Sequence, residues 1–124
     1  MIAYSIDDRL RLIRVRMSGT NTCADLEHHY AEVYRDPKYN SSLRTLFQID
    51  DDAGGPIMAD IPKVKTVMEL ASQSPGALKK WAIVIPSAFK RMVIEYLLKD
   101  LNVRSLEVRY FADEPAALAW LDSN

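Results

Sequence analysis

The sequence is poor in the residue types on which covalent stabilisation and catalysis depend. Its 124 residues include one cysteine, Cys23, so no intramolecular disulfide can form, and we expect a reducing, cytoplasmic environment. With only four glycines and two histidines, the chain has no glycine-rich phosphate loop, no Gly-x-Ser-x-Gly elbow and no Cys-x-x-Cys pair. These absences favour a protein that is not an enzyme and carries no cofactor.

The chain also lacks a strong charge and a long apolar run. Its 16 lysines and arginines against 17 aspartates and glutamates give a net charge of −1, which does not attract nucleic acid or an anionic membrane at long range. No segment approaches the roughly 20 apolar residues that cross a bilayer, and residues 1–8 do not resemble a signal peptide. We therefore expect a cytoplasmic protein without membrane insertion, folded as a single domain over residues 1–124.

Apolar residues recur with alternating strand and helix periods along the chain. Strands are predicted at 2–6, 10–17, 43–49, 81–85 and 106–111. Helices are predicted to follow the capping residues Thr22, Ser87 and Asp113, and another to include Pro62 in its first turn. The resulting order, β-β-α-β-α-β-α-β-α, is typical of an α/β fold with a mixed, mostly parallel five-stranded sheet that opens with an antiparallel hairpin.

Local patterns sharpen this prediction. Thr22 and Asp25 have the spacing of a capping box. The adjacent apolar pair Leu12 and Ile13 breaks the alternation of its strand, so we expect either a bulge there or a strand covered on both faces. The run Trp81–Ile85 is apolar throughout and is expected inside the sheet, under helices. The helix that follows it is expected to bury the face made of Phe89, Met92, Val93, Tyr96, Leu97 and Leu101.

Parts of the sequence resemble a known family. The segment Lys80–Val84 (KWAIV), the ending Ala117–Leu121 (ALAWL) and the opening hairpin resemble the small bacterial SpoIIAA-like proteins, which share the fold of the STAS domain. The resemblance implies a mixed five-stranded sheet in sequential strand order with the first strand antiparallel. It also implies no catalytic machinery: related STAS-like folds act as protein-interaction modules, and relatives of similar architecture bind lipids or other small ligands.

The sequence departs from this family type at one position. Phosphorylated STAS proteins carry an Asp-Ser-Ser-Gly-like segment after the third strand, and the matching stretch here is Asp51–Gly54. Ala53 stands where the resemblance places the phosphorylated serine, and alanine has no hydroxyl to accept a phosphate. The serine-phosphorylation switch is therefore not expected in this chain.

The acidic loop that begins at Asp50 is the main candidate for a working surface. Carboxylates at the carboxyl end of a parallel strand lie where open α/β sheets keep ligands. However, consecutive side chains point in different directions and no second acidic cluster follows another strand, so we expect a solvated loop and no metal site. A hydrolase that uses the aspartates is a weaker alternative. The candidate interaction or ligand surface comprises Asp50, Asp51, Asp52, Ala53, Gly54, Gly55 and Met58.

Other residues with chemical potential are interpreted as structural. His28 and His29 are adjacent on a helix and cannot chelate one ion together. Cys23 is expected to pack near the start of a helix and not to act as a nucleophile. The arginines near the second strand are expected to pair with Asp7, Asp8 and acidic helix residues and not to bind nucleic acid; they are Arg9, Arg11, Arg14 and Arg16. The aromatic residues interpreted as core are Trp81, Tyr96, Phe111 and Trp120.

Two functions follow from the resemblance to the SpoIIAA-like proteins, from the missing catalytic residues and from the composition of the loop. The first is a regulatory or protein-interaction module that associates with itself as a homodimer and works through the loop 50–61 and the start of the second helix. The alternative is a carrier that holds a small apolar or amphipathic ligand in a cleft between the second and third helices. In that case the loop 53–61, which contains two glycines and a proline, forms the roof of the cleft.

Overall fold

The computed structural model describes residues 1–71, 79–99 and 106–123. The strands are β1 Ile2–Asp7, β2 Leu12–Met17, β3 Arg44–Ile49, β4 Lys79–Val84 and β5 Leu106–Phe111. The helices are α1 Cys23–Arg35, α2 Pro56–Ala59, α3 Ile61–Ala71, α4 Ala88–Leu97 and α5 Glu114–Asp122. The order agrees with the prediction except for the four-residue α2, which forms within the expected loop. No helix in these described ranges is long and apolar enough to cross a membrane.

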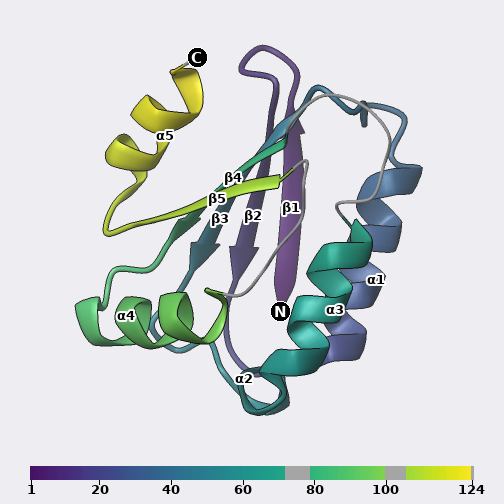
Figure 1. Ribbon diagram of the computed structural model, residues 1–124. Coiled ribbons are helices and arrows are strands. Elements are labelled where there is room, and N and C mark those ends of the chain that lie inside the picture. Colours follow the sequence, from purple (N-terminus) through teal and green to yellow (C-terminus); the bar gives the residue numbers. More distant parts are fainter. Residues whose placement is uncertain (72–78, 100–105, 124) are drawn as a thin grey trace.

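The five strands form one sheet in the order β1-β2-β3-β4-β5 (Figure 1). β1 pairs with β2 antiparallel, and the remaining neighbours pair in parallel. The predicted α/β fold with a mixed, mostly parallel sheet is therefore confirmed. Because β2 to β5 run in the same direction, their carboxyl ends lie at one edge of the sheet, which we call the carboxyl edge.

The start of β2 is covered on both faces. Leu12 packs with Leu46 and Ala82 on the side of α5, whereas Ile13 belongs to the larger apolar cluster on the side of α1 and α3. The pairing of β1 with β2 runs without interruption along both described strands, so no bulge separates these residues. Of the two predicted explanations for the broken alternation, the covered strand is the correct one.

The turn of the first hairpin is longer than predicted. β2 begins at Leu12 and not at residue 10. The carboxylate of Asp7 accepts a hydrogen bond from the amide of Leu10 at 3.0 Å, and Arg11 adopts a left-handed backbone conformation with a φ of 54°. These two features hold residues 8–11 in the turn and delay the start of the strand.

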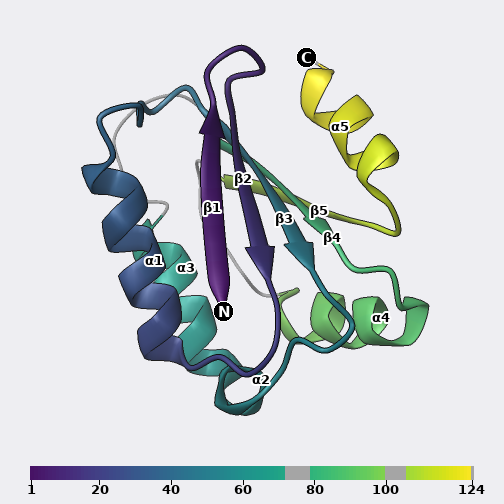
Figure 2. The same ribbon diagram turned by 180° about the vertical axis from the view of Figure 1, so that it is seen from behind.

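Helices cover the two faces of the sheet unequally (Figure 2). α1 and α3 lie side by side over one face, and α5 covers part of the other. The interior strand β4 is buried on both sides as predicted, since residues 81–85 are each at most 5% exposed. α4 lies near the carboxyl edge of the sheet (Figure 1), and its buried Ile94 belongs to the apolar cluster on the side of α1 and α3.

Helix starts follow the predicted capping residues. The hydroxyl of Thr22 accepts from the Asp25 amide at 3.1 Å, and the Asp25 carboxylate accepts from the Thr22 amide at 2.8 Å, which completes the predicted capping box. Ser87 and Asp113 each cap their helix through one side-chain hydrogen bond. The predicted breaker at residues 74–76 lies outside the described residues.

Candidate functional site

The carboxyl edge brings two segments of the chain together. β3 leads into the loop 50–55 and α2, and β4 leads into α4, so both segments leave the sheet at the same edge (Figure 1). Lys90 on α4 joins them, because its Nζ donates hydrogen bonds to the carbonyl oxygens of Asp51 at 2.7 Å and of Ala53 at 3.3 Å. We refer to the loop 50–55 together with the exposed face of α4 as the carboxyl-edge surface.

The three aspartates of this loop point to different partners. Asp50 accepts hydrogen bonds from the Arg16 guanidinium on β2, with both carboxylate oxygens 3.1 Å from Nε. The Asp52 carboxylate accepts from the Gly19 amide at 3.3 Å, and Asp51 is exposed to solvent. The carboxylates therefore diverge. Among the described residues, no group of three His, Cys, Asp or Glu side chains is placed to hold a metal ion.

Backbone contacts fix the loop to the segment that precedes α1. The Gly54 amide donates to the Gly19 carbonyl at 2.9 Å, and the Gly54 carbonyl accepts from the Asn21 amide at 3.0 Å. Gly55 has a φ of 90°, and a Cβ atom at this position would lie 2.5 Å from Cγ2 of Thr20. Only glycine fits there without strain, so the path of the loop depends on this residue.

Ala53 and Met58 take different places in the predicted surface. Ala53 is buried, and its amide donates to the Asp50 carbonyl at 3.0 Å, so this residue forms the turn and presents no side chain to solvent. Met58 lies in α2, and its side chain is outside the part of the chain that is described. The exposed residues of the predicted set are Asp51, Asp52 and Gly55.

The buried face of α4 differs from the prediction, which was wrong. The helix and its C-terminal turn bury Ile94 and Leu98, which are 4% and 6% exposed. α4 carries apolar residues on two opposite sides, and the side with fewer of them contacts the domain. Leu101, the last residue of the predicted face, lies outside the described residues. The side chains that were expected to be buried include Phe89, Met92, Tyr96 and Leu97, which are 73%, 61%, 64% and 37% exposed.

One apolar stripe therefore runs along the outer side of α4. It comprises Phe89, Met92, Val93, Tyr96 and Leu97, and we call it the α4 stripe. Contiguous exposed apolar patches on globular proteins mark sites of contact with other molecules. Phenylalanine, tyrosine and methionine are also the residue types enriched in the centres of protein interfaces. Tyr96, which was expected in the core, is thus part of an exposed surface, with Lys99 Nζ 4.2 Å from its ring centroid.

A second candidate site is an apolar cavity between α3, α4 and the sheet. α3 contributes Ile61, Val64 and Met68, and the α4 segment contributes Ile94 and Leu98. The cavity has a volume of about 70 Å³. It lies between the two helices where the cleft was predicted, but it is smaller than the cavity of about 150 Å³ that can hold one benzene molecule.

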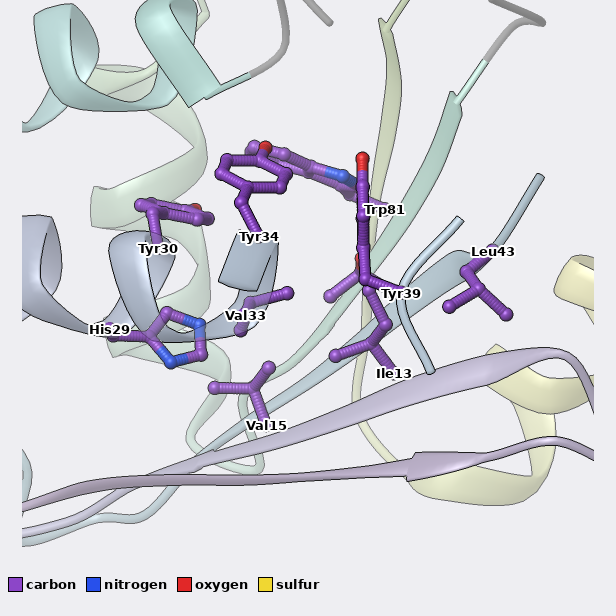
Figure 3. Close-up of a pocket in the computed structure, with 10 residues that line it drawn as sticks. Ile13, Val15, His29, Tyr30, Val33, Tyr34, Tyr39, Leu43 and Trp81 are labelled. Atoms are coloured by element: carbon purple, nitrogen blue, oxygen red, sulfur yellow. The ribbon is translucent and has the colours of Figure 1, made fainter. Parts of the chain in front are cut away.

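A smaller hollow lies between α1 and the sheet (Figure 3). Its volume is about 20 Å³, room for on the order of one water molecule. Burial lowers the pKa of His29, which lines this hollow, to about 4, so the imidazole is neutral at pH 7. Tyr30 stacks on Trp81 with ring centroids 6.0 Å apart, and burial raises the pKa of its hydroxyl. This arrangement is that of a packed aromatic core.

Cys23 and His28 lie on α1 in positions that give them structural roles. Cys23 is buried, and burial raises the pKa of its thiol, which fits the predicted packing role and not a nucleophile. His28 Nε2 lies 2.6 Å from Glu32 Oε1 on the exposed side of the helix. His29 points into the protein, so the two histidines face different surroundings as predicted.

The arginines of the first hairpin are divided between the turn and the strand. Arg9 and Arg11 lie in the turn. On β2, Arg14 forms an ion pair with Glu114 of α5, and Arg16 pairs with the acidic loop as described above. The pair of Arg14 with a helix carboxylate agrees with the expected pairing, whereas Arg16 pairs with the loop residue Asp50 and not with the expected Asp7 or Asp8.

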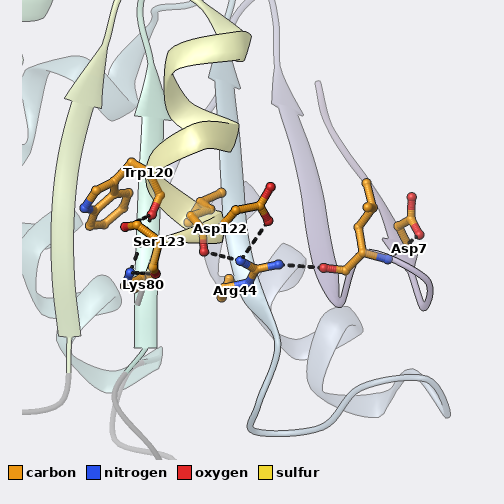
Figure 4. A network of polar contacts seen from close by, with 8 residues as sticks. Asp7, Arg44, Lys80, Trp120, Asp122 and Ser123 are labelled. Atoms are coloured by element: carbon orange, nitrogen blue, oxygen red, sulfur yellow. Dashed lines mark hydrogen bonds and ion pairs between the residues drawn. The ribbon is translucent and has the colours of Figure 1, made fainter.

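A polar network fixes the C-terminal end of α5 on the sheet (Figure 4). Arg44 on β3 donates to the carbonyl oxygens of Leu121 and Leu10, the latter at 2.6 Å. Lys80 on β4 donates to the Ser123 carbonyl at 2.6 Å. Cations at this end of a helix satisfy its free carbonyl groups and interact favourably with its dipole. We therefore assign a structural role to this network.

Comparison with known proteins gives one match. A family model described as SpoIIAA-like matches residues 12–122, which extend from β2 to the end of α5. Searches of curated proteins and of solved structures gave no match. The matched family agrees with the observed sheet, in which the strands follow their sequence order and only β1 is antiparallel.

Proposed function

The chain belongs to the SpoIIAA-like family, and on that premise we propose that it is a non-enzymatic regulatory module whose single domain binds another protein. Membership of this family supports a regulatory module of STAS type in general. Proteins of this type are generally not enzymes. The working surface is the carboxyl-edge surface, extended by α2 and the start of α3. We also propose a cytoplasmic location, in line with the single cysteine.

The exposure of the α4 stripe carries this proposal. Phe89, Met92 and Tyr96 are each more than 60% exposed on one side of a single helix. Full burial of a large apolar side chain contributes about 1.5–3 kcal/mol, so a partner that covers three of them gains substantial binding free energy. The exposed charges of the neighbouring loop supply the polar rim that surrounds the apolar centre of many interfaces.

The proposed module works without a serine switch in the loop. Ala53 has no hydroxyl and is 6% exposed, so a kinase finds neither an acceptor nor an accessible side chain at this position. The neighbouring Asp52 keeps a fixed negative charge and accepts a hydrogen bond from the Gly19 amide. Binding then depends on the concentration of the partner and on surface charge, and not on phosphorylation of this loop.

Capture of partners from an extract of the source cells tests this function. Phe89→Asp places a charge in the α4 stripe and should reduce capture of the specific partner roughly 30-fold or more, as at an interface hot spot. Asp51→Lys should also weaken capture of this partner, because it reverses a charge in the loop 50–55. Leu70→Asp is the matched control, because Leu70 is 64% exposed on α3 and is not part of the carboxyl-edge surface. Equal capture by the wild type and by a folded Phe89→Asp variant would contradict the proposal.

The apolar cavity favours a second candidate function, a carrier of a small apolar or amphipathic ligand. At about 70 Å³ the cavity accepts only a few atoms, so a larger ligand requires α4 to move away from α3. Native mass spectrometry of freshly purified protein tests this candidate. A carrier shows an added small-molecule mass on the 14.1 kDa chain that disappears on denaturation. Ile61→Trp should displace that mass and Leu70→Trp should retain it, whereas unmodified chain masses throughout would argue against a carrier.

A further inference from the structure

We propose that this chain forms a two-fold symmetric dimer in which the β5 strands of two copies pair antiparallel and join the two sheets. This inference goes beyond the proposed function, because it uses another surface and names a second copy of the chain as the partner. β5 is the last strand of the sheet, and within the described ranges it pairs with β4 alone. The side of β5 that faces away from β4, which we call its outer edge, is a template for a strand of another molecule.

The direction of the backbone groups of β5 limits how a second strand can pair with it. The amide of Ile85, directly after β4, donates to the Phe111 carbonyl at 2.9 Å, so the backbone groups of Phe111 face β4. Successive residues direct these groups to opposite sides of a strand, so those of Glu107 and Arg109 also face β4. The residues whose N–H and C=O groups point to the outer edge are therefore Leu106, Val108 and Tyr110.

A two-fold axis at Val108 uses all of these outward groups. It places the two Val108 residues opposite each other and Leu106 opposite Tyr110 of the second copy, and each of these pairs exchanges two backbone hydrogen bonds. Between them it places Glu107 opposite Arg109, at the positions where facing side chains lie closest. An axis at Glu107 or at Arg109 would bring two like charges face to face, and an axis nearer either end of β5 would pair fewer residues.

The charges of β5 are placed for this contact. Glu107 and Arg109 lie on the side of the sheet that carries α5, where the Arg109 guanidinium is 5.3 Å from the ring centroid of Trp120. Their side chains are 39% and 60% exposed, and Arg109 Nη2 lies 3.7 Å from Glu107 Oε1 of the same chain. In the dimer each Arg109 lies between two Glu107 carboxylates, one from each copy, so the four charges alternate in sign. Edge strands that avoid pairing commonly carry lysine or proline, and β5 (LEVRYF) has neither.

The other face of β5 supplies an apolar contact. Leu106, Val108 and Tyr110 are half-buried against the larger apolar cluster. Antiparallel pairing sets Leu106 of one copy beside Tyr110 of the other, so each covers part of the apolar surface that the other leaves exposed. A strand of six residues is roughly 20 Å long, so the contact buries less than the roughly 800 Å² per partner of a standard interface. We therefore expect a reversible dimer with a Kd in the micromolar range.

Reversal of either charge tests the pairing of Glu107 with Arg109. Glu107→Arg alone and Arg109→Glu alone should each raise the Kd of the dimer roughly 10-fold, measured by sedimentation equilibrium, because like charges then face each other. A mixture of the two variants should form a mixed dimer with nearly the Kd of the wild type, since every facing pair is again of opposite sign. Mixing cannot rescue an effect that arises within one chain. A monomeric wild type at every concentration, or folded variants whose mixture shows no recovery, overturns the proposal.

Cysteines at the same two positions test the geometry. The Cα atoms of a facing pair between the hydrogen-bonded positions are about 4.5 Å apart, within the range that a disulfide spans. Mild oxidation of a mixture of Glu107→Cys and Arg109→Cys chains, one carrying a larger tag, should give mainly the mixed covalent dimer on non-reducing gels. Each variant alone should crosslink little, because its two thiols lie diagonally across the axis. The native Cys23 is buried and does not compete. Equal yields of mixed and like dimers, or no crosslink, overturn the proposed register.

Two further variants separate β5 from other surfaces and other partners. Phe89→Asp alters the α4 stripe and should leave the Kd of the dimer unchanged; if it abolishes the dimer while the β5 variants do not, this inference is overturned. Val108→Pro removes the central outward N–H, at an edge position where proline is tolerated, and should abolish the dimer. If the wild type is monomeric and folded Val108→Pro loses a captured protein that Phe89→Asp retains, the outer edge binds a segment of another protein and the dimer is overturned.

Discussion

Lys90 Nζ on α4 lies 2.7 Å from the carbonyl oxygen of Asp51 and donates a hydrogen bond to it. The same ammonium group reaches the carbonyl oxygen of Ala53 at 3.3 Å. One side chain therefore holds the loop after β3 against the helix after β4, although Lys90 and Asp51 are 39 residues apart in the sequence. The position of the acidic loop is linked through this contact to the position of the α4 stripe.

Lys90→Met tests whether this contact orders the loop. The substitution keeps the aliphatic part of the side chain and removes a charged donor that contributes roughly 1 kcal/mol. We expect little loss of global stability but faster amide exchange at Ala53 and Gly54, measured by hydrogen–deuterium exchange mass spectrometry. Lys99→Met removes another cation of the same segment and is the matched control. Identical exchange in the wild type and Lys90→Met would show that the contact does not order the loop.

Two adjacent glycines provide a matched test of the loop geometry. Gly55→Ala should lower the free energy of unfolding by about 1–3 kcal/mol, because its φ of 90° is strained for alanine and its Cβ would meet Cγ2 of Thr20 at 2.5 Å. Gly54→Ala should cost much less, since no heavy atom lies within 4 Å of its Cβ position. Urea unfolding of both variants measures the difference, and equal destabilisation would contradict the observed path of the loop.

The buried His29 predicts a pH dependence of stability. Burial lowers its pKa in the folded protein from 6.5 to about 4, while Glu32 on the same helix opposes this shift. Between these values the unfolded chain binds a proton that the folded chain does not, so the free energy of unfolding falls as the pH falls, by about 3 kcal/mol in total. Above pH 6.5 the imidazole is neutral in both states and contributes no pH dependence.

Unfolding of variants between pH 7 and pH 4 isolates this effect from the titration of carboxylates. His29→Gln should flatten the slope relative to the wild type. His28→Gln changes the exposed neighbour and should keep the wild-type slope. Equal slopes in the wild type and His29→Gln would show that the imidazole is not buried as described.

Val84→Ala tests the position of β4 inside the sheet. The Val84 side chain is 5% exposed and packs with Ala117 and Leu121 of α5. Its truncation leaves a small cavity and should cost roughly 1–3 kcal/mol. Leu70→Ala removes an exposed apolar side chain and should change stability by no more than about 0.5 kcal/mol. Similar losses in the two variants by thermal or chemical unfolding would place β4 nearer to the surface than described.

The regular elements were largely predictable because their signals are local. The capping residues Thr22, Ser87 and Asp113 set the starts of three helices, and uniform apolarity placed Trp81–Ile85 inside the sheet. The start of β2 was not predictable from alternation, because the left-handed Arg11 extends the turn. The short α2 was missed because it lies within a loop sequence that contains glycine and proline.

The orientation of α4 could not be predicted from its own sequence. The helix has an outer apolar side, centred on Met92, and an inner one formed by Ile94 and Leu98, and apolar spacing favours burial of the larger side. The sequence did carry one signal of this orientation. Apolar residues lie on two opposite sides of the helix, and this indicates that one side can contact another molecule. The anchoring of Gly54 and Gly55 by residues 19–21 was equally hidden, because those contacts join segments more than 30 residues apart.

A photoreactive residue in the α4 stripe tests the central claim most directly. p-Benzoylphenylalanine is placed at position 92 of the full chain in living cells, and position 70 on α3 serves as the control with a similar exposure in the native chain. Illumination is expected to give a protein adduct larger than the 14.1 kDa chain from position 92 and little or none from position 70. If position 92 gives no adduct, or the same adducts as position 70, the α4 stripe is not the surface through which this protein binds a partner.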